Sequence, residues 1–163
     1  MKEVYIVTHT QATHHVDGLV GGWFDSELTA KGLHDAKACG RRLHELQLDG
    51  VPIYSSDLAR TRQTAHEIAQ CLGSPIEWDD RLREMSFGEA GGLSQEDVGG
   101  SILSSDGDNR LDFRNVYNGE TKRELASRLY DAMHELIQEE RAIVMHAWLC
   151  DHVPYRLLDW YAD

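Results

Sequence analysis

The sequence has few of the features that mark secreted or membrane-bound proteins. It contains three cysteines among 163 residues, and none forms a Cys-x-x-Cys pair. An odd, unpaired set favours reduced thiols in a reducing compartment and argues against a disulfide framework. The apolar run Val4–Val7 is far shorter than a bilayer-spanning helix, and no signal-peptide cleavage site follows it. We therefore expect a cytoplasmic protein with no membrane partner.

Basic residues are also scarce. Lys and Arg number 16 against 28 Asp and Glu, which gives a formal net charge of −12. A field of this sign repels polyanions, so nucleic acid and anionic membranes are not expected partners. Any site for a phosphorylated ligand must therefore be a local cluster of hydrogen-bond donors that works against the overall field.

The length fits one domain over residues 1–163. Short β-branched or aromatic runs predict buried strands at Val4–Thr8, Val51–Ser55, Ile76–Trp78 and Ala142–Met145. Segments with helical spacing of apolar residues follow each of the first two strands, precede the fourth, and continue over Trp148–Tyr161. This alternation predicts an α/β domain with a largely parallel sheet.

Helix-capping residues and glycines divide the chain further. Ser26 or Thr29 is a candidate cap for the first long helix, and Ser56 or Asp57 for the second, which Gly73 should end. Residues 81–118 show a weaker pattern rich in Gly, Ser and Asp. A long irregular segment of this kind is typical of a substrate-facing insertion.

Reactive side chains follow three of the predicted strands. His9 follows the first strand, Arg60 comes just after the second, and His146 follows the fourth. In open parallel sheets, ligands bind beyond the carboxyl ends of the strands, so these residues should converge. Imidazole is a nucleophile toward phosphorus, and guanidinium matches phosphate oxygens. Glu84, in a nearby Gly- and Arg-containing loop, is the candidate proton donor.

The chain resembles the histidine phosphatase superfamily, the phosphoglycerate mutase-like group. Five segments match the family's blocks in order: THTQATHHVDGLVGGWFDSELTAKG, YSSDLARTRQTA, LREMSFGEAGGLS, NGETKRELASRL and VMHA. The resemblance implies a three-layer α/β/α fold, a small phosphorylated substrate, and no metal or other cofactor.

The resemblance also implies residue roles. His9 would be the phosphorylated nucleophile, Arg60 a phosphate clamp and His146 the second pocket histidine. Glu84 would be the general acid that later activates water. The phosphate-binding set would be Thr8, Thr10, His15, Arg60 and Ala147. The expected reaction is phosphomonoester hydrolysis through a phosphohistidine.

The motif around His9 departs from the family pattern. Thr8 replaces the usual Arg and Thr10 the usual Gly, while His15 stands at a frequent Asn and Gly21 at a frequent Gln. A hydrogen bond to a charged group is worth about 1.5–3 kcal/mol, so its loss should cost about ten- to a hundredfold in rate. A protonated His15 would partly restore the charge and make activity rise toward mildly acidic pH.

Two other functions remain open within the family. The replacement at Thr8 is compatible with a non-catalytic member that binds phosphorylated ligands or a protein partner. Phosphoglycerate mutase-type phosphoryl transfer is a weaker alternative. The short stretch after His146 predicts an uncovered sheet edge, and on that basis a homodimer.

Plainer interpretations apply to single residues. Glu84 could pair with Arg81 or Arg83 on the surface instead of entering the site. Trp23 and Phe24 are expected to pack against the core.

A metal-dependent hydrolase is the weakest alternative. His9, His14 and His15 would supply ligands, joined by Asp151 and His152. The spacing fits no common zinc signature, so we expect no metal.

Overall fold

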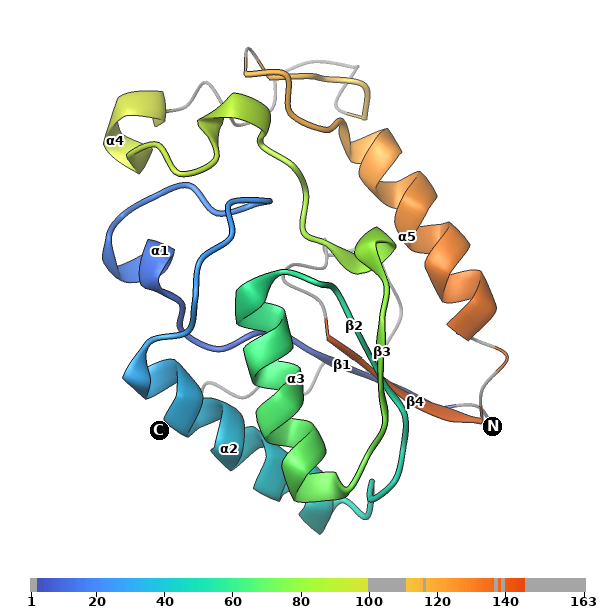
Figure 1. The fold of residues 1–163 in the computed structure, drawn as a ribbon. Coiled ribbons are helices and arrows are strands. Elements are labelled where there is room, and N and C mark those ends of the chain that lie inside the picture. Colours follow the sequence, from blue (N-terminus) through green and yellow to red (C-terminus); the bar gives the residue numbers. More distant parts are fainter. Residues whose placement is uncertain (1–2, 100–110, 116, 137, 139, 146–163) are drawn as a thin grey trace.

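The structure is a computed structural model that describes residues 3–99, 111–115, 117–136, 138 and 140–145 (Figure 1). Two predicted site residues, His146 and Ala147, and the helix predicted over Trp148–Tyr161, lie outside these residues.

Four parallel strands form the sheet. They are β1 (Glu3–Val7), β2 (Ile53–Ser55), β3 (Ile76–Trp78) and β4 (Arg141–Met145), in the order β1-β4-β2-β3. Of these four strands, the last in sequence, β4, thus lies between β1 and β2, with Ile143 opposite Tyr5 on one side and opposite Ile53 on the other. All four predicted strands are confirmed to within two residues. Because the strands are parallel, their carboxyl ends share one edge, where the segments containing His9 and Arg60 begin.

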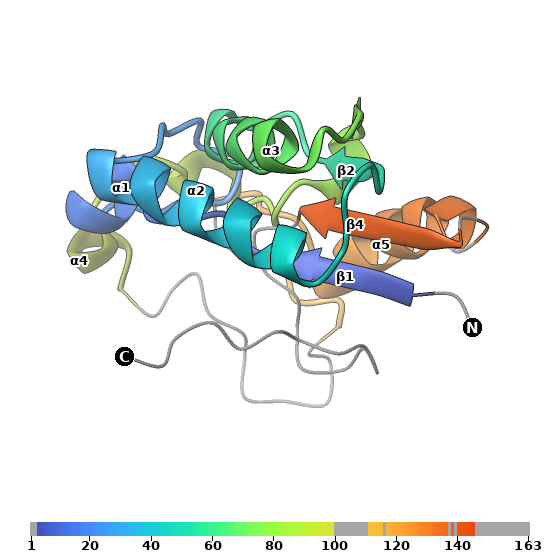
Figure 2. The same ribbon diagram turned by 90° about the horizontal axis from the view of Figure 1, so that it is seen from below.

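Helices cover both faces of the sheet. α2 (Ala30–Glu45) and α3 (Ala59–Leu72) lie side by side against one face (Figures 1 and 2). Their apolar residues form one core cluster with β1, β2 and β4, centred on the fully buried Ile53, Ile68 and Ile143. α5 (Lys122–Leu136) packs on the other face through a second cluster that includes Ala132 and Val144. The predicted three-layer α/β/α arrangement is confirmed.

The long helices begin and end by identifiable local interactions. The Thr29 hydroxyl accepts the backbone N–H of Gly32 at 3.0 Å and caps α2, as predicted. Gly73, at φ 62°, ends α3 in the left-handed conformation that glycine adopts without strain.

The predicted cap of α3 is wrong. The N-cap position is Leu58, and neither Ser56 nor Asp57 caps the helix. The Asp25 carboxylate accepts the backbone N–H of Ala59 at 2.6 Å instead, from 34 residues away in sequence. Ser56 bonds the Thr61 hydroxyl.

The connecting segments contain short helical turns: α1 (Thr13–Val16), η1 (Asp80–Leu82), η2 (Gly88–Ala90) and α4 (Gln95–Val98). Within the predicted insertion, Leu82 is fully buried against α5, so the segment begins in the core. None of the helices described is long and apolar enough to cross a membrane.

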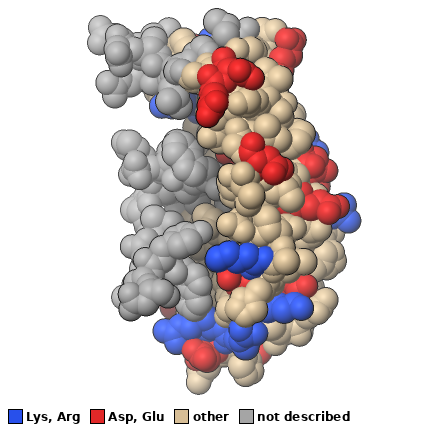
Figure 3. Space-filling view, turned by 90° about the vertical axis from the view of Figure 1, so that its left-hand side faces the viewer, with Lys and Arg blue, Asp and Glu red and all other residues tan. Residues whose placement is uncertain are grey.

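Charges of both signs are distributed over the surface that Figure 3 shows. Lys and Arg gather mainly in the lower half of this view, while Asp and Glu lie mainly above them. At the lower end of this view, basic side chains lie next to one another with acidic side chains beside them.

Candidate active site

His9 lies two residues beyond the end of β1, and only 8% of its surface is exposed. Its Nδ1 is 2.8 Å from the Thr10 carbonyl oxygen, and its Nε2 is 3.1 Å from Nε of Arg60. A carbonyl only accepts and a guanidinium only donates, so the ring proton lies on Nδ1. The lone pair therefore lies on Nε2, on the side facing Arg60. This is the tautomer that a nucleophilic imidazole requires.

The imidazole of His9 stays neutral over a wide pH range. Burial, and secondly the positive charge of Arg60, lower its pKa from 6.5 to about 3. The hydrogen bond to the Thr10 carbonyl acts in the opposite direction and is too weak to offset them. At neutral pH Nε2 is therefore unprotonated, and its lone pair accepts the hydrogen bond from Nε of Arg60.

Arg60, in the first turn of α3, is fully buried and links three parts of the chain. Its Nη1 donates to the Phe24 carbonyl at 2.9 Å, and its Nη2 donates to the Gly22 carbonyl at 2.6 Å. The same Nη2 donates to Oε2 of Glu84 at 2.9 Å. Since Nε contacts His9, one guanidinium joins the imidazole to the carboxyl group.

Glu84 is mostly buried, with 17% of its side chain exposed. Burial raises the pKa of its carboxyl group, while Arg60 and the backbone N–H of Gly22 oppose the shift. A carboxyl group with a raised pKa retains its proton nearer to neutral pH, as a general acid needs.

The surface pairing considered for Glu84 is wrong. Arg81 pairs with Asp79 and Glu135, and Arg83 pairs with Asp57.

Two further histidines lie against His9. The His15 ring stacks on the His9 ring with centroids 5.4 Å apart, and the His14 and His15 ring centroids are 4.0 Å apart. The Ala12 N–H donates to Nδ1 of His15 at 3.2 Å, which places the His15 proton on Nε2. Burial and Arg60 lower the pKa of His15. Both observations favour a neutral His15 ring that donates from Nε2 over the protonated His15 expected from the sequence.

The two threonines beside His9 differ in their surroundings. Thr8 is exposed. The Thr10 hydroxyl donates to the Gly32 carbonyl at 2.7 Å and so holds the loop after β1 against α2.

No group of three or more His, Cys, Asp or Glu side chains suited to a metal ion occurs in the described part of the chain. Asp151 and His152, of the weakest alternative, lie outside it.

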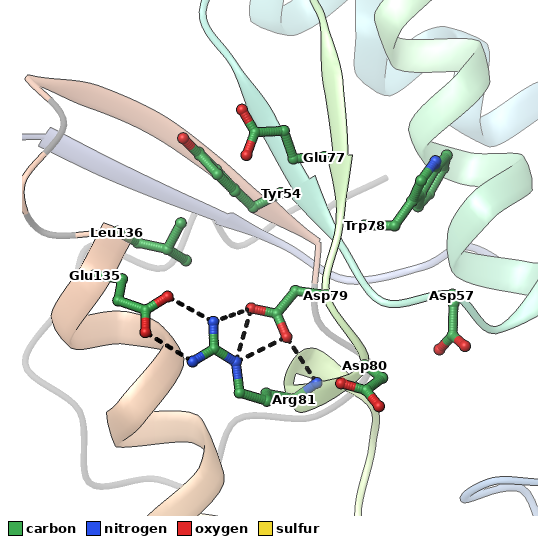
Figure 4. Close-up of a pocket in the computed structure, with 9 residues that line it drawn as sticks. All are labelled: Tyr54, Asp57, Glu77, Trp78, Asp79, Asp80, Arg81, Glu135 and Leu136. Atoms are coloured by element: carbon green, nitrogen blue, oxygen red, sulfur yellow. Dashed lines mark hydrogen bonds and ion pairs between the residues drawn. The ribbon is translucent and has the colours of Figure 1, made fainter.

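A separate cavity of about 650 Å³ lies where β2 and β3 meet the end of α5 (Figure 4). Five carboxylates line it: Asp57, Glu77, Asp79, Asp80 and Glu135. Arg81 spans Asp79 and Glu135, which leaves the lining acidic. Carboxylates repel a phosphate group, so this cavity is a poor site for a phosphorylated ligand. Arg60, whose guanidinium could bind an oxyanion, does not line this cavity.

A sequence model of the histidine phosphatase superfamily (branch 1) matches residues 4–162. The chain belongs to the histidine phosphatase superfamily. Its similarity to a curated protein from Salmonella choleraesuis (strain SC-B67), named "Probable phosphoglycerate mutase GpmB", is 33% identity over 145 residues. That match covers 85% of this chain and 64% of the relative, so the chain spans less than two thirds of the relative's length.

Solved histidine phosphatase-fold structures resemble the chain closely. The mycobacterial glucosyl-3-phosphoglycerate phosphatase in complex with VO3 aligns with a TM-score of 0.74 and 26% identity, over 90% of this chain and 75% of that one. The protein TTHB049 from Thermus thermophilus aligns with a TM-score of 0.67 and 25% identity, over 88% and 77%. The predicted family and fold are confirmed.

Two residues beside Glu84 were not predicted as part of this histidine phosphatase site. Trp23 is 45% exposed, and its Nε1 donates to the Glu84 carbonyl at 2.7 Å. Arg128 of α5 donates to the same carbonyl at 2.8 Å. The sequence pattern does not distinguish Arg128 from the exposed Arg123 on the same helix, so only the tertiary contact identifies Arg128.

Proposed function

We propose that the chain is a phosphomonoester hydrolase that acts through a covalent phosphohistidine at His9. The single observation that carries the proposal is the line of contacts from Nε2 of His9 through the guanidinium of Arg60 to the Glu84 carboxyl group. It joins a neutral nucleophile, an oxyanion-binding group and a proton donor in one buried cluster.

The first step transfers the phosphoryl group. A phosphate oxygen of the substrate accepts the hydrogen bond from Nε–H of Arg60. His9 Nε2 then no longer accepts that hydrogen bond, and its lone pair is free. Nε2 attacks phosphorus, the bond from phosphorus to the ester oxygen breaks, and Glu84 gives its proton to the departing oxygen. Arg60 stabilises the negative charge on the transferring group.

The second step releases phosphate. The Glu84 carboxylate takes a proton from water as the water oxygen bonds phosphorus, and the bond between phosphorus and Nε2 breaks. Inorganic phosphate leaves, while His9 and protonated Glu84 return to their starting states. No metal enters either step.

The proposed phosphate-binding set is Thr8, Thr10, His15, Arg60 and Ala147, and His146 is the proposed second histidine of the pocket. His15 enters as a neutral Nε2–H donor in place of the amide usual at its position. The proposed substrate is a small phosphorylated molecule bound at the carboxyl edge of the sheet. Homodimer formation remains a prediction, as does a cytoplasmic location.

The replacement at Thr8 supports a second candidate, a non-catalytic member that binds phosphorylated ligands. Thr8 is exposed and has no charge to offer a phosphate group. Phosphoglycerate mutase-type transfer is a third candidate, which the name of the Salmonella relative supports.

One experiment separates hydrolysis from ligand binding alone. The protein is mixed with p-nitrophenyl phosphate, quenched within milliseconds, and analysed by mass spectrometry for an acid-labile adduct on His9. The hydrolase forms the adduct and H9Q does not, while T8R forms it about ten- to a hundredfold faster. An adduct that appears only in T8R supports the binding function, and turnover abolished by a chelator supports a metal-dependent hydrolase.

A further inference from the structure

Arg128 has an unusual set of partners for a residue on a surface helix. All five of its N–H groups meet acceptors. Nη1 donates to the carbonyls of Arg81 and Arg83, each at 2.6 Å, and Nη2 donates to the Glu84 carbonyl at 2.8 Å. Three backbone positions within four consecutive residues are thus bound by one side chain that comes from a distant helix.

The remaining N–H groups of Arg128 bind Glu120. Nε and Nη2 contact its two carboxylate oxygens at 2.6 and 2.8 Å, in an ion pair whose side chains are 17% and 11% exposed. Glu120 also accepts the Ser86 N–H at 3.2 Å and donates its own backbone N–H to the Ser86 carbonyl at 2.7 Å. The pair therefore holds the chain on both sides of Glu84, from residue 81 to residue 86.

The Glu84 backbone has a second support. Its carbonyl accepts from Trp23 Nε1 as well as from Arg128, so both lone pairs of that oxygen are occupied. Gly22 and Phe24, which flank Trp23, are the residues whose carbonyls bind Arg60. The backbone of Glu84 is consequently fixed relative to the guanidinium that its own carboxyl group contacts.

We propose that Arg128 is a positioning residue, which holds the Glu84 carboxyl group where it can protonate the leaving group. The inference rests on the proposed hydrolase function. Its physical basis is that proton transfer requires the donor within hydrogen-bond reach of the departing oxygen. Displacement of a catalytic group by about 1 Å costs about a hundredfold in rate. Lysine cannot replace Arg128, since an ammonium has three N–H donors and no planar fork.

The dependence of rate on the leaving group tests this role. Protonation is essential for a poor leaving group such as the alkoxide of benzyl phosphate, and nearly dispensable for the phenolate of 2,4-dinitrophenyl phosphate. The measurement is kcat/KM for both substrates, because it includes only steps through formation of the phosphohistidine. We expect R128K to lower kcat/KM about ten- to a hundredfold for benzyl phosphate and less than threefold for the dinitrophenyl ester.

E84Q and R123K are the reference variants. E84Q should show the same selectivity as R128K with a larger loss. Arg123 lies on the same helix and pairs with Asp112 at the surface, so R123K should leave kcat/KM unchanged for both substrates. The pH profile adds a second readout, since loosening of Glu84 should move the basic limb of kcat/KM in R128K and not in R123K.

The outcomes separate the two levels of the proposal. Suppose that E84Q lowers kcat/KM selectively for benzyl phosphate, while R128K lowers kcat/KM equally for both substrates or for neither. Arg128 is then merely structural, and the inference fails while the proposed acid role of Glu84 stands. If E84Q is not selective, the acid role of Glu84 fails and the inference falls with it. If R128K does not fold, E120Q is the alternative variant, because glutamine has the shape of glutamate but lacks the charge that binds Arg128. It must then show the selective loss for the inference to stand.

Discussion

The buried histidines should make the fold sensitive to acid, and His14 provides the test. Its ring is 4% exposed, and Nδ1 lies 2.6 Å from the Ser26 hydroxyl. Burial first, then repulsion from the neighbouring His15 ring when that ring is protonated and from the Arg60 charge, lower the pKa of His14 from 6.5 to about 4. In the unfolded chain, His14 regains its ordinary pKa. Between pH 6.5 and pH 4 the unfolded state therefore binds the extra proton.

The sign and size of the effect follow from this difference. The stability contributed by neutral His14 is complete above pH 6.5 and is lost as the pH falls toward 4. Each pKa unit corresponds to about 1.4 kcal/mol, so the loss by pH 4 is about 3 kcal/mol from this side chain alone. That is a large part of the 5–15 kcal/mol typical of a domain. Since His9 acts in the same direction, we expect acid unfolding rather than activation.

The assay is urea unfolding at half-unit intervals from pH 4 to pH 8. The slope of the free energy of unfolding against pH gives the number of protons bound on unfolding. H14Q removes one titrating group and should reduce that number by about one below pH 6. An unchanged slope in H14Q, or stability that rises toward pH 5, would refute the reasoning.

Three further variants test other features. E84Q should raise the thermal midpoint at pH 8, because burial disfavours the ionised carboxyl group; a lower midpoint would contradict the raised pKa. G32A should destabilise by about 1–3 kcal/mol or more in urea, since its Cβ would lie 2.1 Å from the Gln11 carbonyl oxygen. D25A should cost about 1 kcal/mol through loss of the cap at Ala59, and a wild-type urea midpoint would show that water replaces the carboxylate.

Much of the fold could be predicted because it depends on local pattern. Short apolar runs located the four strands, and the rule that parallel strands share a carboxyl edge predicted that His9 and Arg60 would meet. Their contact at 3.1 Å confirms that expectation. Thr29 and Gly73 act within their own helix ends, so their roles could also be read from neighbouring residues.

The errors have a common physical cause. The cap of α3 comes from Asp25, and the partner of Glu84 is Arg60, 24 positions away, where nearer arginines were available. Pairing at that range depends on tertiary structure, which sequence spacing does not encode. The charge of His15 could not be predicted for the same reason, because its pKa depends on burial and on a guanidinium from another helix.

The two carbonyls that hold Arg60 belong to Gly22 and Phe24, and main-chain oxygens are the same in every amino acid. Gly22 is constrained, since a Cβ there would lie 2.8 Å from the Met85 carbonyl oxygen. Phe24 is not restricted in this way, because its contribution to the clamp is independent of its ring. Substitutions at position 24 can therefore change the side chains around the site while the backbone carbonyl still binds Arg60.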